Sequence, residues 1–246
     1  AMNFLLAWVI FSFIAAAVAG AFAQTKASTP ATRGRAKPAV DRPATTSIPE
    51  AVPVKKGTVA TELVGRTYAN KEFGFEVTFP TTWLIPGDEF ESEMKKAGFD
   101  LSLSPPANVG EVDRIRMNRA LQKIKILVTA YRSMPGSEEN AIVRISTENL
   151  SANPQIKDAV DYFDAMQSQF ASMKLPSDFS YSATGAEKLG KHQFAYIDTT
   201  NSEGKKRLYA TVRKGHAILF SISYTKEEDL QALRQVLSEG NFAFAR

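Results

Sequence analysis

Hydrophobic and polar residues alternate along several short segments of the chain, and this period of two is typical of half-buried β-strands. In residues 74–79, Phe75, Val77 and Phe79 share one face, and Pro80 then ends the segment because proline cannot donate a ladder hydrogen bond. Similar patterns predict further strands over residues 141–147, 193–199, 206–213 and 217–224, and an apolar stretch in the middle of residues 123–131 predicts a central strand there. The connections between successive strands are too short for parallel crossovers, so we expect a mainly antiparallel sheet.

A period of 3.6 residues predicts two helices in the second half of the chain. The first is expected to begin at Asn153 as its N-cap, with Pro154 in its first position, and to stop before Pro176. The second is expected to open with the capping box Thr225–Glu228 and to stop at Gly240. We expect residues 87–97 to form either a short helix or a loop. Strands and helices together predict an α+β fold in which helices cover a mainly antiparallel sheet.

The N-terminal part of the chain is expected to lie outside the globular domain. Residues 1–23 contain a 19-residue uncharged run, 4–22, and an A-x-A pattern at Ala21–Ala23, which predict a signal peptide cleaved before Gln24. The run is also long enough to span a bilayer, so a retained membrane anchor stays as the alternative. Either interpretation predicts an exported protein of the bacterial periplasm or cell envelope.

Composition separates a linker from the domain that follows it. Residues 24–60 contain five prolines and no aromatic residue, and their seven basic and two acidic side chains give a net charge of +5. Because the whole chain carries +4, the remaining residues carry −1, and this balance gives no support for nucleic-acid binding. We expect residues 24–65 to be a disordered basic linker, with contact to anionic lipid as a weaker hypothesis, and residues 66–246 to be one globular domain.

Short motifs along residues 66–246 resemble the PsbP-like family, the extrinsic photosystem II proteins and their bacterial relatives. The motifs are Tyr68–Asn70, Gly74–Pro80 with Trp83, Leu208–Ala210, Gly215–Ser221, Leu230 with Leu233, and Phe242–Phe244. The resemblance implies an α/β/α sandwich on an antiparallel sheet, no catalysis, no cofactor, and a role as an extrinsic or assembly subunit of a membrane complex. The basic, Pro-rich linker is not part of the shared pattern.

Candidate chemistry in the domain is sparse. The chain has no cysteine, which excludes disulfides and thiolate metal sites. A zinc site would need His192 and His216 with carboxylates such as Asp198 or Glu187, but two surface histidines at turns are the simpler interpretation. The sequence contains neither a G-x-S-x-G element nor a P-loop, so we expect no enzyme activity; a hydrolase is the weakest of the hypotheses.

Two basic clusters are candidates for binding an anionic partner. We call the first the basic ridge; it consists of Arg114, Arg116, Arg119, Lys123 and Lys125. The second is the expected turn Lys205–Arg207, which includes Lys206. An ordinary solvated surface is the alternative interpretation of both clusters.

Two functions therefore remain open at the level of sequence. The first is a non-enzymatic accessory protein of a membrane or cell-envelope complex. The second is a carrier of a small ligand or lipid, with a pocket between sheet and helix lined by residues such as Trp83, Phe163 and Tyr196. A cavity of several hundred Å³ with a few polar groups would favour the carrier, whereas a solid core would favour the accessory protein.

Overall fold

The computed structural model describes residues 61–87, 89–99, 101, 111–135, 137, 140–172, 175, 177–202 and 204–243. The expected signal peptide and most of the expected linker lie outside these residues. Regular structure is present from Thr61, five residues before the expected domain boundary at residue 66, because β1 (Thr61–Val64) pairs with β2 (Thr67–Asn70). Gly65 allows the tight turn between the two strands with a φ of 59°.

The first sheet, sheet A, has the strand order β1-β2-β3-β11 within the described residues. Its third strand, β3 (Phe75–Thr78), has the predicted alternation, with Phe75 and Val77 buried and Glu76 and Thr78 exposed. The short β11 (Asn241–Phe242) pairs antiparallel with β3, so the C-terminal end of the described chain returns to the strand that follows its N-terminal hairpin.

The second sheet, sheet B, is entirely antiparallel in the described residues, with the order β4-β5-β10-β9-β8 and with β6 and β7 both on the outer edge of β8. Its strands are β4 (Ile124–Tyr131), β5 (Ile142–Asn149), β6 (Ser180–Tyr181), β7 (Gly185–Leu189), β8 (His192–Asn201), β9 (Gly204–Arg213) and β10 (His216–Tyr224). The strands predicted in this part of the chain correspond to β4, β5, β8, β9 and β10, whereas the sequence does not predict β6 and β7. The expected central position of β4 is wrong, because β4 lies at one edge of sheet B.

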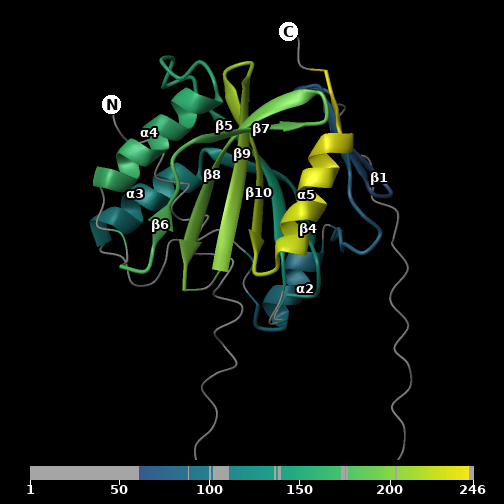
Figure 1. The fold of residues 1–246 in the computed structure, drawn as a ribbon. Helices are drawn as coiled ribbons and strands as arrows, with labels where there is room; N and C mark the ends of the chain where they lie inside the picture. The colour runs from purple at the N-terminus through teal and green to yellow at the C-terminus, as the bar shows by residue number, and fades with distance from the viewer. Residues whose placement is uncertain are drawn as a thin grey trace, which may run out of the picture.

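The helices cover both faces of sheet B, as Figure 1 shows for α4 on one side and α5 on the other. Their bounds are α2 (Phe90–Lys96), α3 (Glu111–Leu121), α4 (Ala159–Ser172) and α5 (Glu227–Glu239). Met117 of α3 and Phe163 of α4 share one core with sheet B, while Leu233 of α5 and Val77 of sheet A share the core on its opposite face. The α+β class with helices on both faces of an antiparallel sheet is therefore confirmed, and sheet A adds strands to the α5 layer.

Both predicted helices begin later than the sequence suggested. Helix α4 begins at Ala159 rather than after Asn153, because Oδ1 of Asp158 accepts hydrogen bonds from the backbone N–H groups of Val160 and Asp161, each at 2.9 Å. Helix α5 begins at Glu227, and its N-cap is Lys226, which makes no side-chain capping bond. The expected capping box is therefore wrong, and acidic side chains in the first turn of α5 complement its dipole instead.

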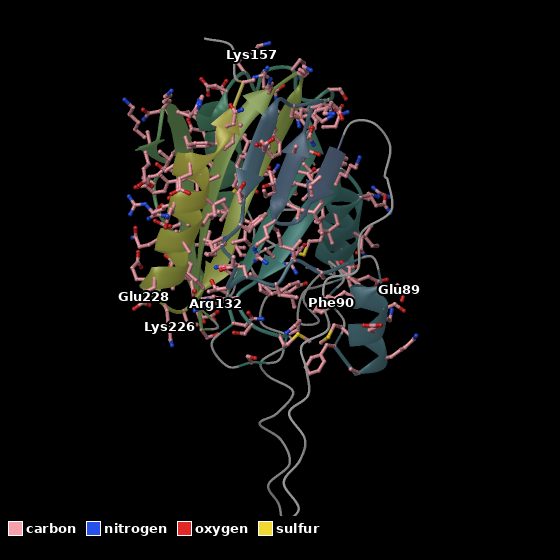
Figure 2. All side chains as sticks on the ribbon, turned by 90° about the vertical axis from the view of Figure 1, so that its right-hand side faces the viewer. Glu89, Phe90, Arg132, Lys157, Lys226 and Glu228 are labelled. Atoms are coloured by element: carbon pink, nitrogen blue, oxygen red, sulfur yellow. The ribbon has the colours of Figure 1, made fainter. Side chains whose placement is uncertain are left out.

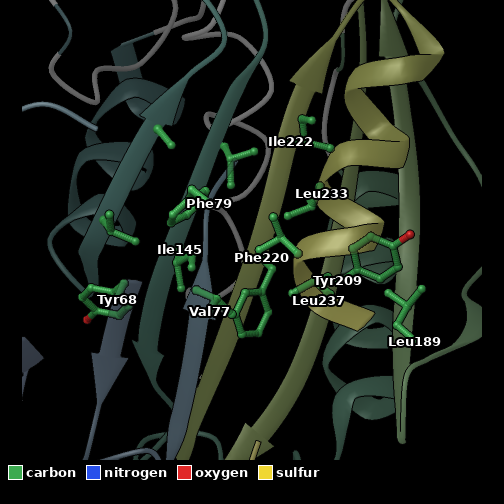
Figure 3. Packing of buried hydrophobic residues seen from close by; sticks show 14 of the residues in the cluster. Tyr68, Val77, Phe79, Ile145, Leu189, Tyr209, Phe220, Ile222, Leu233 and Leu237 are labelled. Atoms are coloured by element: carbon green, nitrogen blue, oxygen red, sulfur yellow. The ribbon is translucent and has the colours of Figure 1, made fainter. Parts of the chain in front are cut away.

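The core between sheet B and the α5 layer is filled by aromatic rings. Phe220 lies edge-on to Phe75, Phe194 and Phe242, with ring centroids 5.5, 5.9 and 5.8 Å apart. Figure 3 shows Val77, Phe220 and Leu237 pointing into this interior from β3, β10 and α5. Edge-to-face rings pack to the density of an organic crystal, so the alternating aromatic segment at Phe75–Phe79 builds the core.

Among the helices that the structure describes, none combines the length and the apolar character that crossing a bilayer requires.

Candidate functional site

The basic ridge lies on α3 and on the strand that follows it. Arg114 and Arg119 are exposed on α3, Lys123 lies half-buried in the turn after the helix, and Lys125 is exposed on β4. Arg116 belongs to the same helix, but its side chain lies outside the described part of the structure. One helix-turn-strand unit therefore carries all five members of the ridge.

The outward side of α3 also carries two exposed apolar side chains. Val112 is 63% exposed and Ile115 is 46% exposed, and their spacing places them on one side of the helix together with Arg119. Met117 and Ala120 point the other way and are fully buried against the face of sheet B that α4 covers, which we call its outer face. Val112 precedes the first ridge residue, Arg114, and Ile115 follows it, so the apolar pair lies at the N-terminal end of the ridge, whose cations continue along α3 into β4.

The sequence does not predict helix α3 by periodicity, although its residues favour a helix. Glu, Arg, Met, Ala and Leu have high helix propensity, and neither glycine nor proline interrupts Glu111–Leu121. However, among the described side chains of α3, Met117 and Ala120 are buried and Leu121 is partly buried, while Val112 and Ile115 face outward. A period of 3.6 is therefore missing from the sequence, because the apolar residues divide between the core and the surface.

The second basic cluster is not a turn of solvated cations. Residues Lys205, Lys206 and Arg207 belong to β9, and alternation along the strand sends them to different environments. Lys205 is exposed, Lys206 is buried and Arg207 is half-buried on the opposite face. Only Lys205 of this cluster is therefore presented to solvent in the way that was expected.

Arg207 is held by a carboxylate on the neighbouring strand. Its Nε and Nη2 donate to the two carboxylate oxygens of Asp198, each at 2.7 Å, which is a bidentate pair. Its guanidinium carbon lies 4.3 Å from the ring centre of Tyr196, close enough for a cation–π contact. The hydrogen bonds to Asp198 raise the pKa of Arg207, so this side chain is a fixed cation inside the fold.

A second carboxylate, Glu187 on β7, completes this polar cluster. Its Oε2 accepts a hydrogen bond of 2.7 Å from the hydroxyl of Tyr209 and lies 3.6 Å from Nη1 of Arg207. Its Oε1 accepts from Nη2 of Arg234 on α5. Burial and the bond to Glu187 raise the pKa of Tyr209, so its hydroxyl stays protonated. The cluster contains two cations and two anions, and it joins β7, β8, β9 and α5 without a net charge.

The residues considered as a pocket do not lie around one cavity. Trp83 and Tyr196 contact the core on the α5 side of sheet B, whereas Phe163 lies in the core on the α4 side. Sheet B separates Phe163 from the other two. Trp83 does border an open groove near the N-terminal end of α5.

The two histidines begin β8 and β10, with β9 between these strands. The His192 ring packs 5.2 Å from the Phe242 ring, and the His216 ring packs 5.2 Å from the Phe73 ring. Asp198 and Glu187, the carboxylates considered as zinc ligands, bond to the arginine and tyrosine side chains described above. Within the described residues, no group of three or more histidine, cysteine or acidic side chains is placed to hold a metal ion.

One buried acidic residue had no counterpart in the sequence analysis. Glu148 on β5 is fully buried on the outer face of sheet B, where its Oε2 accepts a hydrogen bond of 2.6 Å from the hydroxyl of Tyr162 on α4. Its Oε1 has no hydrogen-bond partner among the residues that the structure describes. Burial raises the pKa of Glu148 to about 7, although the bond from Tyr162 and the charge of Lys123 act in the opposite direction.

Comparison with known proteins gives structural neighbours only. No family model and no curated protein matches the chain. The chain is similar to the solution structure of cyanobacterial PsbP (CyanoP) from Synechocystis sp. PCC 6803, with 16% identity, coverage of 76% of this chain and 94% of that chain, and a TM-score of 0.37. PsbP is the family that the sequence motifs resemble. At this identity and TM-score the likeness says nothing about function.

A crystal structure from Bacteroides thetaiotaomicron VPI-5482 is also similar, with 12% identity and a TM-score of 0.32. The match covers 69% of this chain and 45% of that chain.

Proposed function

We propose that the protein is a non-enzymatic, exported accessory protein that binds an acidic surface of a membrane or cell-envelope complex through the outward face of α3. The observation that carries the proposal is the exposed pair Val112 and Ile115 at the N-terminal end of the basic ridge. Protein interfaces commonly combine a desolvated apolar centre with a polar or charged rim.

The charge of this face supports an acidic partner. The domain as a whole is close to neutral, yet Arg114, Arg119, Lys123 and Lys125 are concentrated on one helix-turn-strand unit. The other basic cluster differs, because Arg207 is neutralised by Asp198 and Glu187. A partner with carboxylates beside an apolar patch would complement the α3 face, and such complementarity mainly raises the association rate.

Export is supported by the apolar run at residues 4–22 and the A-x-A pattern at its end.

A non-enzymatic role is supported by the contacts of the carboxylates and histidines that had been considered as site residues. The carboxylates Asp198 and Glu187 bond to arginine and tyrosine side chains, and the histidine rings pack against phenylalanines. These contacts stabilise the fold and leave those groups without an arrangement suited to catalysis.

The test is purification of the tagged full-length protein from native membranes, followed by mass spectrometry of what co-purifies. We expect one or a few proteins to co-purify, and we expect the double substitution Val112→Asp and Ile115→Asp to remove them. Recovery should also fall when salt is raised from about 0.05 to 0.5 M, because added salt screens a charged rim.

Val64 on β1 provides a matched control, because it is also 63% exposed but lies in sheet A. The substitution Val64→Asp should leave co-purification unchanged. A partner that is retained equally by the α3 double variant and by the wild type would refute the α3 face as the binding surface. A protein that purifies alone from native membranes would refute the accessory role.

A further inference from the structure

An open groove of about 880 Å³ lies between the N-terminal end of α5, the turn after β3 and the segment after β4. Its volume is within the range of small-ligand sites. Figure 2 shows Arg132, Lys226 and Glu228 together at one end of the molecule, with Lys157 at the opposite end. The groove belongs to different elements from the α3 face, so it is a second candidate site.

The groove is lined by charges of both signs in equal number. Arg132 and Lys226 are cations, and Glu228 and Asp229 are anions. Nε of Arg132 lies 3.4 Å from Oδ1 of the buried Asp229, and this ion pair fixes the guanidinium at the wall of the groove. Because these four charges sum to zero, the lining gives no net attraction to a ligand with a large charge of either sign and is compatible with a ligand that has no net charge.

Hydrogen-bonding capacity is high along the same walls. Thr82, Ser133 and Ser137 contribute hydroxyls, and Gln235 contributes an amide. Hydroxyls and amides both donate and accept, while the carboxylates accept and the cations donate. This mixture suits a ligand whose own groups also donate and accept, as sugar hydroxyls do.

Apolar surface is limited to a few residues of the lining. Pro80, Trp83 and Ala232 border the groove, and Trp83 and Ala232 also contact the core beneath it. Trp83 is only 3% exposed, so the apolar surface that reaches the groove comes mainly from the half-buried Pro80 and Ala232. A fatty acyl chain would therefore lie against mostly polar walls.

The strand edge beside the groove is already occupied. The backbone N–H of Leu84 donates to the carbonyl of Tyr131 at 2.7 Å, and the N–H of Tyr131 donates to the carbonyl of Leu84 at 2.8 Å. An extended peptide therefore cannot pair with the end of β4 here, and recognition must use side chains.

The geometry points to a binding site for a short, uncharged oligosaccharide in the groove formed by Arg132, Lys226, Glu228 and Asp229. This site goes beyond the proposed accessory role, because it concerns a different surface and a different class of ligand.

The test is isothermal titration calorimetry of the full-length chain with three uncharged sugars, maltotriose, cellotriose and N,N′,N″-triacetylchitotriose, each up to about 10 mM, so that weak binding is also detected. At least one trisaccharide should bind saturably. Lys226→Ala and Glu228→Gln should each weaken that binding about tenfold, because each removes a charged hydrogen-bonding group. Both side chains are exposed, so these variants should fold as the wild type does.

Lys157→Ala is the matched control for Lys226→Ala, since both lysines are exposed and they lie at opposite ends of the molecule. It should leave the affinity unchanged. The inference is overturned if none of the three sugars binds, or if the groove variants bind as tightly as the wild type. Tighter binding of inositol hexakisphosphate or trialanine than of every trisaccharide would also overturn it, because the groove would then select a charged ligand or a peptide.

Discussion

The hydroxyl of Tyr162 donates a hydrogen bond of 2.6 Å to a carboxylate, Glu148, that has no exposure to solvent. The pair joins α4 to β5 inside the core on the outer face of sheet B. An ionised carboxylate in such a place loses its hydration, and a single hydroxyl replaces only part of it. Protonation of Glu148 near neutral pH relieves this cost, which links folding stability to pH.

The sign of this linkage follows from the raised pKa. Glu148 has a pKa of about 7 in the folded protein against an ordinary value of 4.5, so the folded state binds the proton more tightly than the unfolded state. Its contribution to stability is fully present below about pH 4.5, falls as the pH rises to about 7, and is then constant. The whole change amounts to about 3 kcal/mol.

We therefore expect Glu148→Gln to flatten the pH dependence of stability. Glutamine keeps the shape and a hydrogen-bond acceptor for Tyr162 but does not ionise. Urea unfolding at about pH 5 and pH 8 should give the variant a stability advantage over the wild type only at the higher pH. Glu76→Gln, at an exposed position on β3, is the control and should follow the wild type. Parallel pH profiles for Glu148→Gln and the wild type would contradict the assignment.

Arg66 holds the turn that follows the aromatic strand. Its Nε donates to the carbonyl of Phe79 at 3.2 Å, and its Nη2 donates to the carbonyls of Pro80 and Trp83. A guanidinium reaches several acceptors at once, whereas an ammonium is a single point of contact. Arg66→Lys should therefore cost about 1–2 kcal/mol of stability and Arg66→Ala somewhat more, as measured by urea unfolding. Equal stability of the lysine variant and the wild type would show that the forked geometry contributes nothing.

The strands of the core were predictable because one physical signal dominates them. Phe75, Val77 and Phe79 alternate with polar residues, and the last three strands of sheet B are joined by short turns. In β3 the burial of one face sets the period of two, whereas β10 is buried on both faces and is therefore apolar along most of its length. The short edge strand β7 lacks a strong alternation of its own, since it is defined by pairing with β8, and such long-range pairing is not encoded in a local pattern.

The surface sites were only partly predictable, for a different reason. The charges of the basic ridge are visible in the sequence, but the exposure of Val112 and Ile115 depends on which side of α3 meets the sheet. The burial of Glu148 also depends on tertiary packing, because it follows from the arrival of Tyr162 from α4. Lys206 and Arg207 are neighbours in the sequence and suggest one basic cluster, but their side chains point to opposite faces of β9.

Asp198 and Arg207 form a half-buried ion pair, and we expect replacement of either residue to lower the stability of the fold. Among the described residues, Asp198→Ala leaves the guanidinium with the more distant Glu187 as its one remaining ion-pair partner. We expect a loss of about 2–3 kcal/mol in thermal or urea unfolding, because a poorly solvated cation loses its partner. Asp164→Ala, on α4, serves as a comparison at an exposed carboxylate and should cost less than about 1 kcal/mol. If the two substitutions have the same effect, the pair does not stabilise the fold.

A glycine can be required by its backbone conformation or by the lack of space for a Cβ atom. Gly65 meets the first condition, and Gly190 meets both. Both have a left-handed backbone, with φ of 58° and 59°, so alanine should be strained at either position by about 1–2 kcal/mol. A Cβ at Gly190 would lie 2.2 Å from the carbonyl oxygen of Ser238 in α5, whereas a Cβ at Gly65 meets nothing within 4 Å. Because the obstacle is backbone, α5 itself would have to shift, and we expect Gly190→Ala to cost about 1–3 kcal/mol more than Gly65→Ala in urea unfolding. Equal costs would mean that the turn between β7 and β8 does not pack against the end of α5 as closely as the structure has it.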